Sequence, residues 1–178
     1  MEKFVDTLGV LTVPNFTVHL DEVILKTGRI SRRIRIDHPR AVAVIPLIDE
    51  ERILMVRQYR YALGKDTLEI PAGKVDRNES LYDAVLRELK EETGYTAEDL
   101  TPLISFYPAV AYSNEVIDIF LARNLKKLCE PLDEDEISSV EIVHLREALD
   151  MIKSGAVKDG KTIIAIFSLF VGVGNAGG

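Results

Sequence analysis

The chain has very few cysteines and no long apolar run. Its single cysteine, Cys129, excludes an internal disulfide, which fits a reducing cytoplasm and a plain buried or half-buried thiol. The longest apolar run, Ile163 to Val173, is far too short to span a bilayer. The first six residues lack the basic and apolar regions of a signal peptide. We therefore expect a soluble, cytoplasmic protein with no membrane partner.

The chain also has fewer basic than acidic residues. The 22 Lys and Arg residues are outnumbered by 29 Asp and Glu residues, which gives a net charge of −7. Non-specific binding to nucleic acid depends on Lys and Arg neutralising phosphates, so we expect no nucleic-acid partner. A small anionic substrate needs only local positive charge, for which bound metal ions and Arg40, Arg57 and Arg60 are the candidates.

The length and the pattern of strands and helices predict one main domain with a small appendage. With 178 residues and 47% hydrophobic content, the chain can bury a sizeable core. Alternation predicts paired strands near the N-terminus, and Ala41 to Ile48 is an apolar run typical of a strand covered on both faces. It should pair with the strand Ile53 to Gln58 across an acidic turn. The expected strands are 16–25, 29–36, 41–48, 53–58, 68–71, 103–107, 116–122 and 140–145, and the expected late helices are 146–154 and 161–171. This pattern predicts an α/β/α sandwich around a mixed sheet.

The segment 73–95 carries most of the functional information. It reads as a helix from about Glu79 to Thr93, with Asp76 or Asn78 as N-cap and Gly94 at the left-handed C-cap position. Leu81, Val85 and Leu89 form its apolar stripe. We expect this helix to pack one face on the core.

Three acids lie within one turn of that helix. Glu88 is a helical neighbour of both Glu91 and Glu92, and each like-charge pair costs roughly 0.2 to 0.5 kcal/mol. Because Glu88 and Glu92 flank the apolar stripe, they would take up protons unless a cation neutralised them. Magnesium suits such an all-oxygen site, whereas zinc would need His or Cys, which the segment lacks. A solvated acidic helix face is the alternative interpretation.

These residues resemble the box of the Nudix hydrolases. The family pattern is Gly, five residues, Glu, seven residues, Arg-Glu, an aliphatic residue, any residue, Glu-Glu, any residue, Gly and a further aliphatic residue. The matching positions are Gly73, Glu79, Arg87, Glu88, Leu89, Glu91, Glu92 and Gly94, and Tyr95 alone departs, at a packing position. The sandwich expected above agrees with the Nudix fold.

The resemblance implies a metal-dependent hydrolase that cuts the diphosphate linkage of a nucleotide. Glu88, Glu91, Glu92 and the main-chain carbonyl of Ala72 would then ligate Mg²⁺, with Mn²⁺ also possible. Arg87 and Glu79 would orient the helix and its loop. A plain ion pair of Arg87 with Asp83 or Glu91 is the alternative, and both can hold together.

Segments outside the box are similar to the ADP-ribose pyrophosphatase branch of that family. They are the N-terminal extension, Val56 to Tyr61, and Leu68 to Gly73. The resemblance implies that Arg60 contacts the substrate's phosphates or terminal ribose and that Glu69 lies close to the metal site. For Arg57 and Arg60, the solvent face of a strand is the alternative.

An acidic segment, Leu132 to Ile137, matches the branch in composition and position. By that resemblance Glu134 is the candidate general base, and Glu136 is either a further metal ligand or the base itself. Acidic crowding raises carboxylate pKa values, which suits a base near neutral pH. An exposed charged turn is the alternative.

One departure bears on the substrate. Enzymes of the branch typically carry a proline about fifteen residues beyond the box, where this chain has Val110, with Pro108 two positions earlier. The expected substrate is therefore a nucleoside diphosphate sugar, with ADP-ribose first and GDP-mannose as an alternative. A house-cleaning nucleoside triphosphatase and a noncatalytic ligand sensor are further alternatives, although sensors usually lose box glutamates.

Residues 1–38 are expected to form a strand region apart from the hydrolase domain at 39–178. In the resembling enzymes the N-terminal strands commonly form a homodimer, in which one subunit completes the adenosine pocket of the other. Phe16 and the strand after it are the candidates for that contact, although an aromatic residue could equally fill a core.

Overall fold

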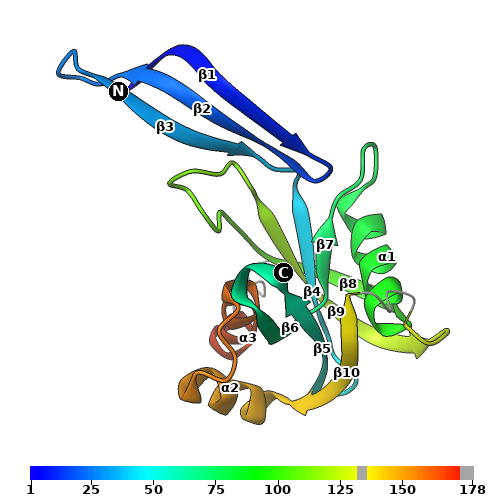
Figure 1. The fold of residues 1–178 in the computed structure, drawn as a ribbon. Coiled ribbons are helices and arrows are strands. Elements are labelled where there is room, and N and C mark those ends of the chain that lie inside the picture. Colours follow the sequence, from blue (N-terminus) through cyan, green and yellow to red (C-terminus); the bar gives the residue numbers. More distant parts are fainter. Residues whose placement is uncertain (132–135, 173–178) are drawn as a thin grey trace. The chain divides into compact units, whose positions relative to one another are not determined.

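The computed structural model describes residues 1–131 and 136–172 (Figure 1). The chain divides into two compact units. Unit 1 comprises Met1–Arg40 and Tyr107–Val116, and unit 2 comprises Ala41–Phe106 and Ile117–Gly178.

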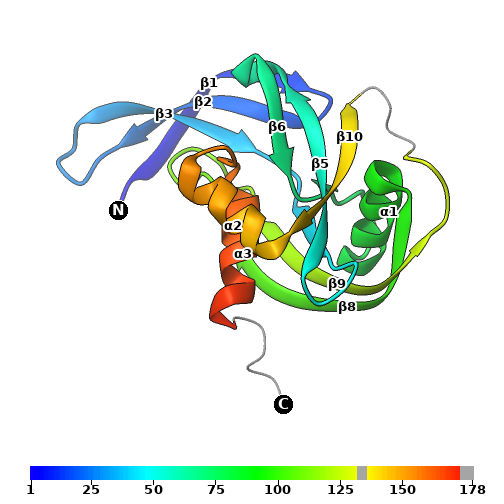
Figure 2. The ribbon, with the colours of Figure 1, turned by 90° about the horizontal axis from the view of Figure 1, so that it is seen from below.

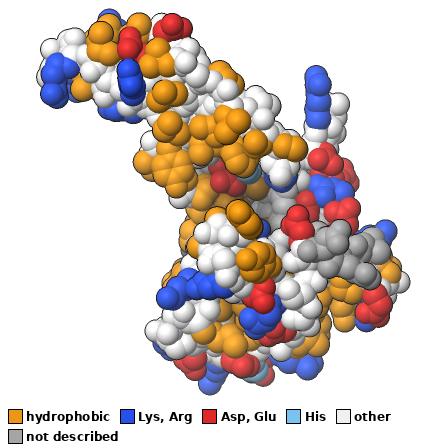
Figure 3. All heavy atoms as spheres, in the orientation of Figure 1, with side chains coloured by type: hydrophobic (Ala, Val, Ile, Leu, Met, Phe, Trp, Pro, Cys, Tyr) orange, Lys and Arg blue, Asp and Glu red, His pale blue; other side chains and the backbone are white. Residues whose placement is uncertain are grey.

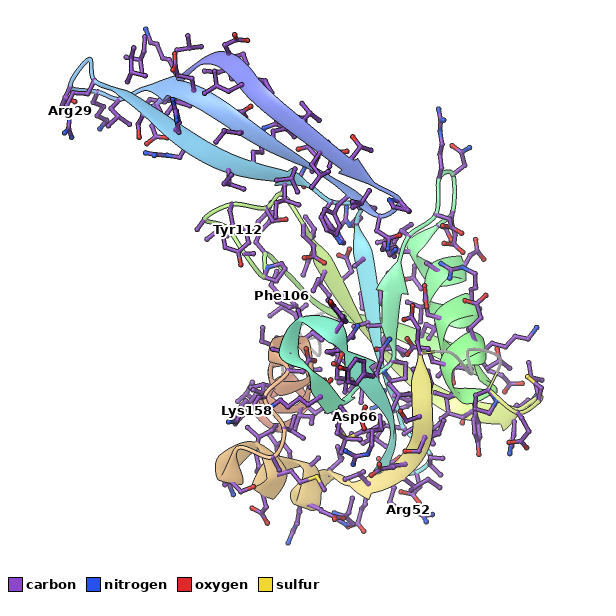
Figure 4. All side chains as sticks on the ribbon, in the orientation of Figure 1. Arg29, Arg52, Asp66, Phe106, Tyr112 and Lys158 are labelled. Carbon is purple, nitrogen blue, oxygen red and sulfur yellow. The ribbon has the colours of Figure 1, made fainter. Side chains whose placement is uncertain are left out.

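Unit 1 is built on an antiparallel sheet in the order β1-β2-β3. Its strands are β1 (Lys3–Val13), β2 (Phe16–Ile24) and β3 (Ile30–Asp37). Gly28, at φ 79°, forms the turn before β3, where Figure 4 labels Arg29. The two strands expected from alternation are confirmed, whereas β1 was missed. Register shifts in β1 break the period-2 pattern that would have revealed it.

Unit 2 contains a four-stranded mixed sheet and a three-stranded antiparallel sheet. The mixed sheet has the order β7-β4-β9-β8, in which β4 and β9 are parallel. The second sheet has the order β10-β5-β6. The strands are β4 (Ala41–Pro46), β5 (Arg52–Arg60), β6 (Lys65–Glu69), β7 (Ala72–Lys74), β8 (Tyr95–Phe106), β9 (Ile117–Lys127) and β10 (Ile137–His144), and a short 3₁₀ turn, Tyr61–Leu63, joins β5 to β6.

Helices cover both faces of the mixed sheet. They are α1 (Leu81–Thr93), α2 (Leu145–Ser154) and α3 (Gly160–Val171). On β4, Ala43 and Ile45 join the core cluster that contains α3 residues, whereas Val42 and Val44 join the cluster of α1. Figures 1 and 2 both draw α1 across β4 and β9 from α2 and α3. The predicted α/β/α sandwich is confirmed. Among the residues described, no helix is both long and apolar enough to cross a bilayer.

The expected pairing of residues 41–48 with 53–58 is wrong. The two strands lie in different sheets and share only an isolated bridge between Leu47 and Ile53. Both edges of β4 are already paired, with β7 on one side and with the distant β9 on the other, so no edge is left for β5. In the connection between the two strands, the Asp49 carboxylate accepts hydrogen bonds from the backbone N–H of Glu51 and of Arg52, at 3.0 and 2.9 Å.

The limits of α1 differ at one end from the expectation. The N-cap is Ser80, whose Oγ accepts from the backbone N–H of Asp83 at 3.1 Å, rather than Asp76 or Asn78. The C-cap is confirmed, since Gly94 is left-handed at φ 77°. A Cβ there would lie 2.2 Å from the carbonyl oxygen of Cys129, so the position requires glycine.

Candidate active site

The box acids lie where α1 packs against β7. Gly73 makes the close approach possible, because a Cβ on it would fall 2.0 Å from the carboxyl carbon of Glu88. The missing side chain lets this carboxylate rest against the β7 backbone. Glu92 reaches the same strand and accepts a hydrogen bond from the backbone N–H of Ala72 at 3.1 Å.

Arg87 ties the helix to the loop before it. Its guanidinium makes a two-bond contact with Glu79, with both distances 2.9 Å, and donates to the carbonyl of Lys74 at 2.8 Å. The remaining nitrogen, Nη1, donates to Glu88 at 2.7 Å and to Glu91 at 3.1 Å. Arg87 holds the pKa of Glu79 below its usual value. The structure thus brings both predicted orienting residues together, and the ion pair with Glu91 is also present.

Glu92 is the most deeply buried acid of the box, with 5% of its surface exposed. Burial, and then the neighbouring Glu88, raise the pKa of Glu92 to about 8, although the N–H of Ala72 and the charges of Lys161 and Arg60 oppose the shift. Burial also raises the pKa of Glu88, against the influence of Arg87. A buried carboxylate beside a partly buried one, both with raised pKa values, is stabilised by an added cation.

The donor set fits a hard divalent ion. Within residues 1–131 and 136–172, no three acidic, histidine or cysteine side chains already converge on one point as a metal cage, because Glu88 and Glu91 turn to Arg87. Magnesium needs few protein ligands, since it keeps several waters and accepts substrate phosphate oxygens. The carboxylate oxygens of the buried Glu92 and the partly buried Glu88, which lies against Gly73, meet that requirement.

A second buried acid, Glu69 at the end of β6, lies in a cluster of donors. Its carboxylate accepts from Arg60 through Nε at 2.8 Å and Nη2 at 2.6 Å, and from the Thr67 hydroxyl at 2.5 Å. Lys161, at the start of α3, makes an ion pair with the same carboxylate. Despite its burial, these partners lower the pKa of Glu69 to about 2. The resemblance implied that Arg60 contacts the substrate and that Glu69 lies close to the metal site. The structure pairs the two with each other, and both roles stay predictions.

Sequence reasoning missed Lys161 and Thr67. The sequence held one signal for Lys161, because a cation in the first turn of a helix opposes the helix dipole and needs a nearby acid.

Arg57 lies on β5 and pairs with Glu141 of β10 at 2.7 Å. Its expected contact with substrate stays a prediction.

The acidic segment is only partly described. Glu134 lies outside the described residues. Glu136 lies just before β10, where it accepts a hydrogen bond from the Gln58 side chain at 2.7 Å. Gln58 is buried, so its amide holds the Glu136 carboxylate at the edge of the β10-β5-β6 sheet.

The remaining predicted residues belong to unit 1. Phe16 stacks on His38, with ring centroids 6.1 Å apart. Arg40 is the last residue of the first stretch of this unit. Val110 is 78% exposed, in the segment where Figure 4 labels Tyr112.

Comparison with known proteins agrees with this geometry. The NUDIX domain model matches residues 37–165. The chain is 43% identical over 151 residues to the ADP-ribose pyrophosphatase of Bacillus subtilis (strain 168), covering 84% of this chain and 82% of that protein. It is 40% identical over 167 residues to the methanol dehydrogenase activator of Bacillus methanolicus, covering 93% and 90% respectively.

A solved structure is similar over nearly the whole chain. The crystal structure of an ADP compounds hydrolase superposes with a TM-score of 0.79 at 27% identity and covers 98% of this chain and 96% of that one. The family model, the relatives and the arrangement of the box acids agree, and the chain belongs to the NUDIX domain family of hydrolases.

Proposed function

We propose that this enzyme hydrolyses the diphosphate linkage of a nucleoside diphosphate sugar, with ADP-ribose, cleaved to AMP and ribose 5-phosphate, as the first candidate. The observation that carries the proposal is the pair of carboxylates formed by the buried Glu92 and the partly buried Glu88, near the cationic groups Arg60 and Lys161. The two carboxylates suit a metal ion, and the two cationic side chains suit an anionic substrate. The names of the Bacillus subtilis relative and of the solved structure support an ADP-linked substrate.

Glu88, Glu91, Glu92 and the Ala72 carbonyl would hold Mg²⁺, or Mn²⁺ in its place. When bound, a divalent ion neutralises a diphosphate and lowers the pKa of a coordinated water. Arg87 prepares the site because its contacts with Glu79 and Lys74 fix the loop against α1. This preorganisation removes the cost of ordering the loop when substrate binds.

Other side chains bind the substrate and move the proton. Arg60 offers a guanidinium to the diphosphate, with Arg57 as a further cation on the same strand. Glu136, held by Gln58, or Glu134 takes a proton from the attacking water. The water then attacks phosphorus in line, and the nucleoside monophosphate or the sugar phosphate leaves.

The substrate assignment is tested by a panel with product analysis. Purified protein with Mg²⁺ is given ADP-ribose, GDP-mannose and nucleoside triphosphates, and the products are separated by chromatography. We expect AMP and ribose 5-phosphate from ADP-ribose at the highest kcat/KM. Preference for GDP-mannose would keep the reaction and change the sugar nucleotide, whereas preference for triphosphates would indicate a house-cleaning enzyme. No cleavage of any of them would favour a noncatalytic sensor and contradict the proposal.

We further propose a cytoplasmic homodimer formed through the β1-β2-β3 sheet. The single free cysteine supports the location, and the exposed apolar side chains of the sheet support the dimer. Figure 3 shows apolar side chains gathered on the face of this sheet that is turned to the viewer. The exposed apolar residues of the whole sheet include Phe4, Val10, Leu11, Ile30 and Ile34. The strand register puts Leu11, Ile30 and Ile34 on one face and Val10 on the other. In such a dimer, Phe16 of one subunit would contact the adenosine bound by the other. Arg40 remains a candidate cation for the substrate's phosphates.

The dimer is tested by light scattering of Leu11→Glu. We expect a shift from dimer to monomer, because a charge in the centre of an apolar interface is costly to bury. Leu128→Glu is the matched control, since Leu128 is similarly exposed but lies in unit 2. A wild-type monomer at micromolar concentration would contradict the proposal.

A further inference from the structure

Lys161 occupies an unfavourable position for a cation unless another group compensates. It is the second residue of α3, where the helix dipole favours negative charge. Only 10% of its side chain is exposed, so water compensates little. Its ammonium group pairs with Glu69, and with Asp159 at 3.1 Å. The position therefore depends on these two acids.

The docking of α3 does not depend on Lys161. Thr162 is fully buried, and its hydroxyl accepts a hydrogen bond from the backbone N–H of Ile70 at 2.9 Å. Asp159 caps the helix by accepting from the N–H of Thr162 at 2.9 Å. Ala165 and Ile166 lie in the core. These contacts anchor α3 beside the end of β6 without help from the lysine. The neighbouring segments can be followed in Figure 4, where Asp66 is labelled on β6 and Lys158 before α3.

Charge balance gives Lys161 a role in anion binding. Arg60 and Lys161 carry two positive charges, and Glu69 and Asp159 carry two negative charges, so the cluster is neutral. Removing Lys161 would leave these residues with a net negative charge, because Arg60 alone would face the two acids. The cluster would then repel a diphosphate.

The hydrogen bonds of Arg60 leave part of its guanidinium for a ligand. In the described part of the chain, its recorded bonds use Nε and Nη2, both to Glu69. The outer nitrogen, Nη1, keeps its two N–H groups for another acceptor, and 38% of the side chain is exposed. Glu69 thus fixes the orientation of Arg60, and Lys161 shares the charge of Glu69.

We propose that Lys161 is a positioning residue that acts through Glu69 to keep Arg60 oriented and able to bind the substrate's diphosphate. This inference rests on the proposed function, because Arg60 is the substrate contact there. Lys161 itself need not touch the substrate.

The test compares Lys161→Met, Lys161→Arg and the double variant Lys161→Met/Asp159→Asn. Methionine removes the charge and keeps the length, whereas the double variant restores a neutral cluster while asparagine still caps α3. We expect Lys161→Met to raise KM by roughly tenfold with kcat little changed, as for a lost ground-state contact. Lys161→Arg and the double variant should recover most of the affinity. Lys153→Met, which removes an exposed lysine paired with Asp150 on α2, should have no effect.

These outcomes separate positioning from a merely structural role. If Lys161 had only a structural role, neutralising Asp159 as well would not restore a low KM. A double variant with a KM as high as that of Lys161→Met would therefore overturn the proposal. An unchanged KM in Lys161→Met would also overturn it.

A second measurement separates this inference from the proposed function. Calorimetry with inorganic pyrophosphate and Mg²⁺ follows anion binding without turnover. If wild type cleaves no nucleotide sugar but pyrophosphate binding weakens in Lys161→Met and recovers in the double variant, the proposed function fails and the role of Lys161 stands. If wild type cleaves ADP-ribose and all variants bind pyrophosphate equally well, the proposed function stands and the role of Lys161 fails.

Discussion

Glu69 and Glu92 are two buried glutamates of unit 2 whose pKa values are shifted in opposite directions. Their exposed fractions are similarly small, at 2% and 5%. The pKa of Glu69 is lowered to about 2, whereas that of Glu92 is raised to about 8. Glu69 receives bonds from two cations and a hydroxyl, but Glu92 receives one backbone N–H and has another carboxylate as its neighbour.

The difference shows that burial does not by itself set the charge of a carboxylate. The partners decide, because each ionised donor offsets part of the desolvation penalty. Glu69 already has its counter-charges within the protein. Glu92 does not, and it is therefore the acid that gains most from an added metal ion.

The largest expected effect is on catalysis in Glu92→Gln. Glutamine keeps the shape but removes the charge that would hold the metal, so we expect kcat to fall about a thousandfold or more while the fold remains intact. Steady-state kinetics and circular dichroism measure the two effects. Glu98→Gln, an exposed glutamate on β8, is the control and should retain full activity. Full activity in Glu92→Gln would exclude the proposed metal site.

Whereas Glu92→Gln should lose activity and keep its fold, Glu69→Gln should lose stability. This change leaves the largely buried Lys161 with one acid fewer, and removing one partner of a buried ion pair costs about 3 kcal/mol. Urea unfolding measures the difference. Glu141→Gln, which breaks the more exposed pair with Arg57, should cost about 1 kcal/mol or less. Equal losses of unfolding free energy in the two variants would contradict the distinction between the buried and the more exposed ion pair.

The two acids also predict opposite pH dependences of stability in metal-free protein. Glu92 has a folded pKa of about 8 against 4.5 as its ordinary value, so its contribution is full below 4.5 and is lost as pH rises through 8. Glu69 contributes above 4.5 and loses its contribution as pH falls through about 2. We expect the free energy of unfolding to fall on the order of 2 kcal/mol between pH 5 and 8.

Thermal unfolding across that range, with and without Mg²⁺, measures this dependence. Glu92→Gln should flatten it, and Mg²⁺ should restore the stability of wild type at pH 8. A wild-type profile that is flat without metal would contradict the raised pKa of Glu92.

The smallest expected effect is that of Gly73→Ala. The new Cβ would fall within 2.0 Å of the Glu88 carboxylate, which is the flexible end of a side chain, so the carboxylate moves and the fold survives. We expect kcat/KM to fall about tenfold, because a ligand displaced by about 1 Å disturbs the reacting geometry. Gly160→Ala, where a Cβ meets nothing within 4 Å, should leave activity unchanged. Equal activity in the two variants would show that the close approach of the Glu88 carboxylate to Gly73 does not matter for activity.

The box was predictable because its information is local. The spacing of Glu88, Glu91 and Glu92 along one helix, and the left-handed Gly94 that ends it, follow from the geometry of a single element. The sandwich was predictable from the alternation of strands and helices. The pairing of residues 41–48 with 53–58 was not, because the partner of β4 comes from the distant β9.

What the sequence by itself determined is therefore the helix with its three acids and the order of elements around it, since both depend on neighbours within a few residues. Only the tertiary structure decided which buried acid is charged. Glu69 is ionised because folding brings Arg60, Thr67 and Lys161 to it, and Lys161 comes from the last helix of the chain. Electrostatic and hydrogen-bonding energies depend on separation in space, and no pattern along the chain encodes that separation directly.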